Sequence, residues 1–316
     1  MLASAVLPAS AWAQLELNGL SLKLPTRYDS RIDRDSGELS KDRFQYQLSL
    51  RSEVSLLNLG KDGQLSLRSL VGTGGSYTSQ WNTLRDRIKD EMGDQHLNLR
   101  QVYTELEFRH WRVQAGVIPP VKGKVSNTSL DKDGWIRGTR VVAPLPAQGR
   151  LEVVTGAIDH LEDPNALQTW DAWNYAEVEW TQDIIAGWRT ELGYVYLDDE
   201  TYLRAEVRRT WHFLGDLPLE LATEGLRNLT TPNWAFDVSA VIKTRWLKTT
   251  LEYSHVPETF GLLGRLSNDF FVLGHLGMLA FKGPIGLIDG INWFSKTYLG
   301  EASIRANVGL VYAIQM

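Results

Sequence analysis

The strongest constraint on the fold is an alternation of apolar and polar residues with a period of two. In 302–316 every second residue is apolar, and the same pattern runs almost unbroken through 43–56 and 234–246. Successive side chains of a β-strand point to opposite faces, so alternation over about ten residues predicts long strands with one apolar face. Helical spacing is nearly absent, and 82–92 is the one short segment for which we expect a helix.

We predict about sixteen such strands along the chain. The connections between them alternate between long ones, such as 75–96, and short ones, such as 59–63. Only 198–200 is short where a long connection is due. Long loops gathered at one end are typical of an up-and-down barrel, and a soluble sandwich has no reason to keep them on one side. The predicted strands are 17–29, 43–58, 64–74, 97–109, 111–118, 135–143, 150–158, 172–181, 185–197, 201–213, 219–226, 233–245, 247–255, 269–281, 285–294 and 302–316.

The polar faces of these segments carry charges of both signs at mid-strand. Arg204, Glu206 and Arg208 share one face, and Glu105 and Glu107 share another. In a soluble lipocalin-like barrel the apolar face points inward, whereas in an outer-membrane barrel it faces lipid and the lumen is polar. A barrel of about sixteen strands is too wide to be filled by side chains, and about ten tilted residues span the hydrocarbon. The charged faces therefore favour the second arrangement.

Aromatic side chains on the apolar phase gather near both ends of the strands, as expected at two membrane–water interfaces. With odd-numbered strands running outward, those near the short turns are Trp111, Trp180, Trp188, Trp211 and Trp246, and those near the long loops are Tyr28, Tyr194, Tyr196 and Trp234. Arg209 is a charged residue on the apolar phase. Because it lies beside Trp211 and Phe213, we expect its guanidinium to extend to the lipid headgroups.

These observations predict an all-β fold. It is a single transmembrane antiparallel up-and-down β-barrel of about 16 strands over 14–316, with short periplasmic turns and longer extracellular loops. Residues 1–13 resemble the end of a secretory signal peptide, with the small-x-small cleavage pattern Ala11-Trp12-Ala13. The alternative for this stretch is a disordered apolar N-terminus.

Composition and spacing argue against several kinds of chemistry. The chain has no cysteine, which excludes thiol catalysis and Cys-ligated zinc, and its net charge of −5 gives no basic footprint for nucleic acid. The six histidines lack the spacing of metal ligands, and 131–134 lacks the later ligands of a calcium loop. Ser254 and His255 are adjacent, so a regular strand points them to opposite faces and prevents a nucleophile–base pair. We therefore predict no enzyme, no cofactor and no metal site.

The whole pattern resembles Gram-negative outer-membrane porins. Within it, 99–141 resembles a strand, turn, strand, long loop and strand of putative-porin and alginate-export-type barrels. The shared residues follow the spacing R-x-x-Y-x-E and then G-x-x-x-P, and here they are Arg100, Tyr103, Glu105, Gly116 and Pro120. Such barrels usually end in Phe or Trp, which the assembly machinery recognises, whereas this chain ends in Met316. The resemblance implies a channel protein without catalysis.

The lumen and the connection 119–134 are where we expect the function to reside. In general porins one long loop folds inward and narrows the pore, and opposing charged rows then select solutes. The constriction-loop candidates are Lys122, Lys124, Asp131 and Asp133. The pore-lining candidates are Arg51, Arg68, Arg100, Tyr103, Glu105, Glu107, Arg112, Arg189, Glu191, Arg204, Glu206, Arg208, Lys243, Arg245 and Arg305. The alternative is that these ion pairs only stiffen the wall of a plugged barrel.

The predicted function is an outer-membrane porin that forms a water-filled channel for passive diffusion of ions or small hydrophilic solutes. One alternative is an outer-membrane export conduit for an anionic polysaccharide, suggested by the arginines of the wall. Another is a structural or adhesive barrel that binds partners through its extracellular loops, and the least favoured is a barrel hydrolase. The expected partners are outer-membrane lipids and lipopolysaccharide, the solutes, and the barrel assembly machinery acting through the C-terminal strand. A monomer and a homotrimer both stay open.

Overall fold

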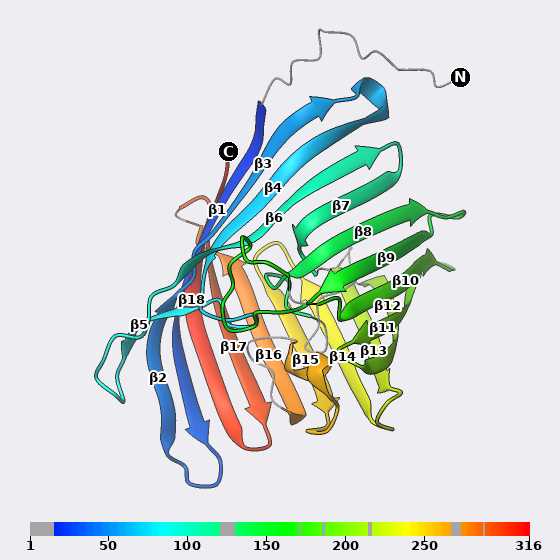
Figure 1. The fold of residues 1–316 in the computed structure, drawn as a ribbon. Coiled ribbons are helices and arrows are strands. Elements are labelled where there is room, and N and C mark those ends of the chain that lie inside the picture. The colour runs from blue at the N-terminus through cyan, green and yellow to red at the C-terminus, as the bar shows by residue number, and fades with distance from the viewer. Residues whose placement is uncertain are drawn as a thin grey trace, which may run out of the picture.

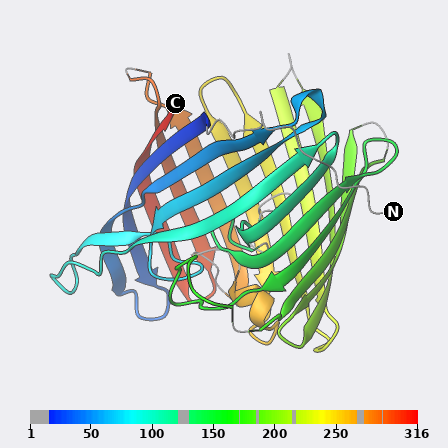
Figure 2. The same cartoon turned by 45° about the horizontal axis from the view of Figure 1, so that its top comes forward.

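The alternating segments form one antiparallel sheet that closes on itself in the computed structural model. Its first strand, β1 (Glu16–Asp33), pairs with its last, β18 (Ser303–Gln315), from Ser21 opposite Gln315 to Asp33 opposite Ser303. Figures 1 and 2 show these two strands side by side in a continuous wall. The predicted all-β barrel is therefore confirmed. The structure describes residues 16–120, 130–170, 172–184, 187–213, 217–266, 273–286 and 288–316.

Eighteen strands occupy sixteen positions in this wall. β3 pairs with the first half of β1 and β2 with its second half, so β2 and β3 together occupy one position. β4 pairs with β3 and β5 with β2, so β4 and β5 together occupy the next position. The strands between β1 and β18 are β2 (Leu39–Tyr46), β3 (Ser49–Asn58), β4 (Gly63–Thr73), β5 (Asn82–Asp86), β6 (Leu97–Phe108), β7 (Trp111–Ile118), β8 (Ile136–Pro144), β9 (Arg150–Ala157), β10 (Tyr175–Asp183), β11 (Trp188–Leu197), β12 (Glu200–Phe213), β13 (Leu217–Asn228), β14 (Trp234–Lys243), β15 (Lys248–Val256), β16 (Gly274–Pro284) and β17 (Ile291–Gly300).

The helix expected over 82–92 is wrong. Its first half is β5, which pairs with β2, and an isolated bridge then joins Asp86 to Glu91. Pairing with a neighbouring strand here overrides the local helical pattern. The described helices are a 3₁₀ turn, η1 (Gly60–Asp62), and α1 (Leu262–Arg265), which the sequence did not predict. Among the described residues, no helix is long and apolar enough to cross a bilayer.

The last two strands before β18 lie later in the chain than predicted. The expected strands 269–281 and 285–294 become β16 and β17, and the turn between them begins only after Pro284. Gly290 closes that turn with a φ of 79°, a left-handed conformation that glycine adopts without strain. As a result, the connection from β17 to β18 is a tight turn at 301–302 instead of a long loop.

The two ends of the barrel differ in their connections. The connections at the end where β18 stops are all short, whereas the strand ends joined by the longer connections 74–81, 87–96, 119–135, 158–174 and 257–273 are at the other end. The short connection predicted at 198–200 is present, as 198–199, but the alternation is otherwise wrong in detail, because 34–38, 229–233 and 301–302 are also short connections at the long-loop end. β1 and β2 extend through most of what was expected to be the first long loop, which explains its shortness.

The apolar phase of the strands faces outward, and the polar phase faces the interior. In β18, Val308 and Leu310 are 56% and 46% exposed, whereas Arg305 and Asn307 are 5% and 1% exposed. The same alternation recurs in β10, where Val178 is exposed and its neighbours are buried glutamates. Apolar side chains outside and polar side chains inside are expected of a membrane barrel, and a soluble barrel has the reverse arrangement.

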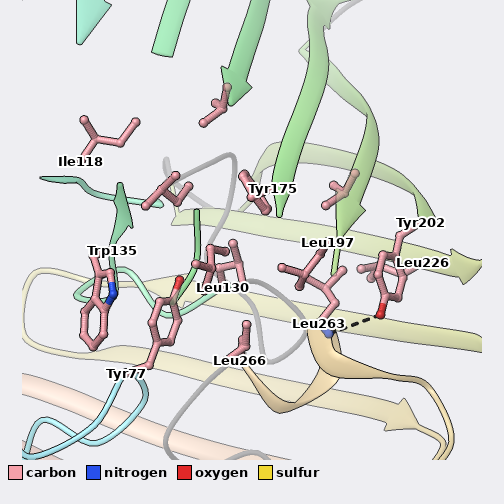
Figure 3. Close-up of a cluster of buried hydrophobic side chains, with 14 of the residues drawn as sticks. Tyr77, Ile118, Leu130, Trp135, Tyr175, Leu197, Tyr202, Leu226, Leu263 and Leu266 are labelled. Atoms are coloured by element: carbon pink, nitrogen blue, oxygen red, sulfur yellow. Dashed lines mark hydrogen bonds between the residues drawn. The ribbon is translucent and has the colours of Figure 1, made fainter. Parts of the chain in front are cut away.

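Apolar side chains gather inside the barrel at the long-loop end (Figure 3). We call this group the inner apolar cluster; its labelled members are Tyr77, Ile118, Leu130, Trp135, Tyr175, Leu197, Tyr202, Leu226, Leu263 and Leu266. The rings of Tyr77 and Trp135 meet edge to face with centroids 4.9 Å apart. The Leu263 backbone N–H donates to the Tyr202 hydroxyl at 3.4 Å, which ties α1 to the wall. Parts of four long connections thus fold into the barrel, since Ile158 and Ala166 also belong to the cluster.

Gly309 of β18 lies close to both of the strands that flank it. A Cβ added there would lie 2.0 Å from the Thr26 carbonyl oxygen and 2.7 Å from the Phe294 ring. We predict that Gly309→Ala lowers the stability of the barrel by about 1–3 kcal/mol, because the seam must open to admit the methyl group. The urea midpoint of the folded, heat-modifiable gel band measures this. Gly277→Ala is the matched control, since its nearest contacts are 3.9–4.0 Å away; equal midpoints for both variants would refute the close approach.

Candidate pore interior

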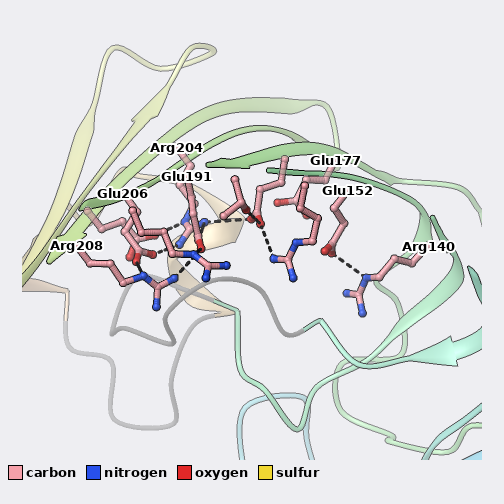
Figure 4. Close-up of polar contacts among 12 residues, drawn as sticks. Arg140, Glu152, Glu177, Glu191, Arg204, Glu206 and Arg208 are labelled. Atoms are coloured by element: carbon pink, nitrogen blue, oxygen red, sulfur yellow. Dashed lines mark hydrogen bonds and ion pairs between the residues drawn. The ribbon is translucent and has the colours of Figure 1, made fainter. Parts of the chain in front are cut away.

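A network of glutamates and arginines covers the inner face of β8–β13 (Figure 4). Arg204 is its centre. Its guanidinium contacts Glu206 at 2.6 Å, Glu179 at 3.2 Å and Glu191 at 3.5 Å, and it also pairs with Glu224. All five side chains are buried. A buried carboxylate is unfavourable unless it is paired. The Arg204 guanidinium provides a shared counter-charge for these four buried glutamates on one wall.

Further arginines extend this network in both directions. Arg208 contacts Glu191 at 2.6 Å and Glu206 at 3.2 Å. Arg140 contacts Glu152 at 2.9 Å and donates to the Gln114 side chain at 2.9 Å. The sequence had placed Arg204, Glu206, Arg208 and Glu191 on the lumen side, and the structure brings them together there. Arg140 and most of the other acids were not among the chosen site residues.

A second group of paired charges lies on β3, β4, β6 and β7. Arg68 contacts Glu53 at 2.9 Å and Glu105 at 3.0 Å, and Arg112 contacts Glu107 at 2.9 Å. Glu105 is buried, whereas Glu107 and Arg112 lie nearer the short-turn end and are about half exposed. Tyr103, another candidate, is buried on the same inner face.

Arg100 holds the loops rather than lining open space. It is the extra residue of a bulge, because the pairing of β4 with β6 steps from Gln101 to Leu99. Its guanidinium donates to the carbonyl oxygens of Ser76 at 2.8 Å, Tyr77 at 3.0 Å and Asp133 at 3.0 Å. The bulge thus aims a fully buried arginine at two connections and fixes both against the wall.

The described part of the predicted constriction loop lies inside the barrel. Asp133 forms ion pairs with Arg51 at 2.5 Å and with Lys132 at 2.6 Å. Asp131 accepts a hydrogen bond from the Gln80 side chain, and its backbone N–H donates to the Leu266 carbonyl at 3.2 Å. Lys122 and Lys124 lie outside the described residues. The segment 130–134 therefore bridges the wall at β3 to the loop 74–81 and to α1.

The two carboxyls of this segment titrate differently. Burial raises the pKa of Asp131 to about 7, against the opposing attraction of Lys132. Burial alone would also raise the pKa of Asp133, but Lys132 and Arg51 more than offset it and hold that pKa below its usual value. Asp131 is consequently the carboxyl of this loop whose charge changes near neutral pH.

A basic patch lies on β1, β2 and β18, and the sequence analysis had predicted only Arg305 of its residues. It consists of Arg27, Arg31, Lys41, Arg43 and Arg305, which line a cavity of about 200 Å³ together with Trp81. Arg305 pairs with Asp29 at 2.6 Å, and Arg43 with Asp29 at 2.9 Å. The buried Asp29 is thus paired with two of the five cations of this patch. The alternation R-x-D-x-R over 27–31 and K-x-R over 41–43 could have predicted these charges on one strand face. The sequence analysis assigned 30–42 to a loop instead.

The remaining predicted site residues lie near the short-turn end. Arg189 contacts Glu191 at 3.5 Å, and Lys243 is the last, exposed residue of β14. Arg245 does not lie on the barrel wall. It is in the turn 244–247, where the Thr244 hydroxyl accepts the backbone N–H of Leu247 at 2.9 Å, and its guanidinium lies 4.8 Å from the centre of the Trp246 ring. The strand ends before this position, so its lumen assignment was wrong.

The histidine pair formed by β15 and β16 was also missed. His255 and His275 are directly opposite and stack with ring centroids 4.1 Å apart on the outer face. His275 Nδ1 lies 2.6 Å from the Tyr253 hydroxyl. In the part of the chain that the structure describes, no three potential ligands gather closely enough to hold a metal ion. Ser254 is buried on the inner face, opposite to His255, as alternation requires.

The fold defines the chain as a sixteen-position antiparallel barrel with an apolar exterior and a charged interior. Comparison with solved structures finds the same fold in OccAB4 of Acinetobacter baumannii, with a TM-score of 0.60, 10% identity, and coverage of 96% of this chain and 99% of that chain. OccK8 (OprE) of Pseudomonas aeruginosa gives a TM-score of 0.61 at 10% identity, covering 94% and 98%. OpdQ of the same organism gives 0.60 at 9% identity, covering 94% and 97%.

The comparisons by sequence add no relative. No family model matches the chain, and no curated protein matches it. The likeness to the solved structures therefore concerns the fold. The alginate-export-type resemblance expected from 99–141 gains no support from the comparisons.

Removal of the central arginine should be strongly destabilising. In Arg204→Gln, the carboxylates of Glu179, Glu191, Glu206 and Glu224 lose their common counter-ion inside the barrel. We predict a loss of about 3–5 kcal/mol, measured by urea unfolding of the purified barrel. The double variant Arg204→Gln/Glu224→Gln should recover part of this loss because it removes one unpaired charge. A single variant as stable as the wild type would contradict the role of Arg204.

Asp131 should make the stability depend on pH. Its pKa is higher in the folded protein, about 7, than the value of about 3.9 in an unfolded chain, so the folded state binds the proton more tightly. The contribution of Asp131 to the stability is then greatest below pH 4 and is lost as the pH rises to about 7, a loss of roughly 2–4 kcal/mol. We expect Asp131→Asn to lose this contribution and to be more stable than the wild type at pH 8. Urea midpoints of the wild type and of Asp131→Asn at pH 5 and pH 8 measure this pH dependence. An equal pH dependence in the two proteins would rule out the role of Asp131.

Proposed function

We propose that the chain is an outer-membrane porin, a channel for passive diffusion of ions or small hydrophilic solutes. The observation that carries this proposal is the inversion of the barrel: exposed apolar residues cover its outside, and buried charged residues cover its inside. Such an inversion suits a wall that faces lipid on one side and water on the other. The solved structures that share the fold are those of Occ and Opd outer-membrane porins, which supports the same function and location.

The arrangement of the connections supports a narrowed channel rather than a wide one. The segment 130–134 crosses from β3 to α1 inside the barrel, and the inner apolar cluster fills the long-loop end beside β7–β15. An inward loop that narrows the lumen selects solutes by size and by the charges that line it. Asp131 and Asp133 would then be constriction residues, as the sequence suggested.

The charge of the interior supports a preference for anions. On β8–β13 the arginines are offset by glutamates, so that wall presents little net charge. The basic patch on β1, β2 and β18 gathers five cations at one cavity, and two of them, Arg43 and Arg305, pair with Asp29. Because a patch of one sign raises the local concentration of counter-ions, anionic solutes should enter more readily than cationic ones.

Two parts of the proposal rest on the sequence. Residues 1–13 would be removed on export as a signal peptide, and the barrel assembly machinery would recognise β18 in spite of its terminal Met316. The mass of the protein isolated from outer membranes tests the first, and comparison of Met316→Phe with the wild type during assembly tests the second.

Electrical recordings test the channel. We predict stable open steps when the purified protein is added to a planar lipid bilayer, with a reversal potential under a salt gradient that indicates anion preference. The double variant Arg27→Glu/Arg43→Glu should shift that reversal potential towards cations by reversing two charges of the basic patch. Arg227→Glu is the control, because Arg227 lies on the outer face over Trp234, with its guanidinium 5.1 Å from the ring centre. A folded barrel without conductance would refute the proposed function.

A further inference from the structure

The outer wall carries a charged residue for which a solute channel has no use. Arg209 lies on the outer face of β12, directly opposite Trp188 of β11 and Leu221 of β13. Its guanidinium lies 5.1 Å from the centre of the Trp188 ring and 4.9 Å from that of Trp211. Arg209 Nε is buried, and no acceptor is found for it among the residues that the structure describes.

In this arrangement the described partners of the Arg209 guanidinium are the two indole rings. The faces of two indole rings attract a cation but offer no oxygen to the guanidinium N–H groups. On the outer phase of β10–β18, the described residues include no Asp or Glu, so none of these strands presents a described carboxylate beside Arg209. A contact with a second copy of this wall would likewise bring no acid to Arg209. The guanidinium therefore fits an anion supplied from elsewhere.

An apolar groove begins beside Arg209 and crosses the outer wall. It has a volume of about 370 Å³, within the range of about 300–1,000 Å³ typical of ligand sites. Large side chains such as Trp188, Leu221 and Leu251 form its sides, and the smaller Thr223 and Ala240 lie between them. The groove therefore offers apolar surface next to a single cation.

We propose that this groove and Arg209 form a binding site for one glycerophospholipid, with an acyl chain in the groove and the phosphate on Arg209. The inference rests on the proposed outer-membrane location. Arg209 lies towards the end of β12 at Phe213, which is the short-turn end, so the lipid belongs to the leaflet facing those turns. Charge complementarity identifies the occupant, because a guanidinium binds phosphate oxygens in a bidentate manner and the adjacent Trp rings suit the headgroup level.

Native mass spectrometry of the intact, detergent-purified protein with added palmitoyl-oleoyl-phosphatidylglycerol tests the site. We expect one tightly retained lipid on the wild type and an affinity at least tenfold lower in Arg209→Gln. Ala240→Trp, which fills the groove, should lower the affinity to a similar extent. Arg227→Gln is the matched control, since it removes an arginine that also lies over a tryptophan on the outer face, but it should retain the lipid. The heat-modifiable gel shift verifies that each variant is folded.

Several results would overturn the proposal. Equal lipid retention in the wild type and Arg209→Gln would do so, as would an equal loss in Arg209→Gln and Arg227→Gln, because the effect would then belong to any arginine at the interface. A change of oligomeric state in Ala240→Trp without loss of lipid would assign the groove to contacts between copies. Conductance of the same samples separates the two proposals: a conducting protein without the lipid site refutes only the site, and a lipid-binding barrel that does not conduct refutes only the channel.

Discussion

The pairing of β1 with β18 is the contact on which the rest of the structure depends. A sheet of sixteen positions that did not close would leave two rows of unpaired N–H and C=O groups, which have no partner in an apolar surrounding. Closure extends to the chain end, where the backbones of Leu20 and Met316 exchange hydrogen bonds of 3.0 and 2.8 Å. Once the wall is closed, the two faces of every strand enter different environments. That separation explains why a period-two sequence can be apolar on one phase and densely charged on the other.

Enclosure then dictates how the charges are arranged. On an open surface, ion pairs such as those of Arg204 would contribute little, because water screens them. Inside the barrel the carboxylates of Glu179 and Glu191 are 0% exposed, so each requires a partner. The network on β8–β13 is therefore nearly balanced by necessity. The basic patch is different, because its five cations line one cavity.

The sequence predicted the strands and their phases because alternation is a local signal. It assigned Val308 to the outside and Arg305 to the inside correctly, since each follows from position in the strand. It did not predict β5, because pairing with β2 depends on a distant strand. It missed Arg31 and Lys41 for a related reason: 30–42 is rich in charges, and only its pairing with β18 and β1 makes it strand. The sequence analysis also did not predict the inner apolar cluster, because Tyr77, Trp135 and Leu263 belong to connections that meet only after the wall closes.

The interior is asymmetric, and this bears on where a solute would pass under the proposed function. The inner apolar cluster lies against β7–β15, where α1 and the segment 130–134 fill the space. Asp133 is linked across to Arg51 on β3, which brings that segment to the edge of the opposite wall. The cavity of about 200 Å³ beside it is lined by the basic patch of β1, β2 and β18 and by Ser79 and Trp81 of the loop 74–81. The constriction and the positive charge would therefore act on a solute at the same level, so size and charge selection would be coupled rather than sequential.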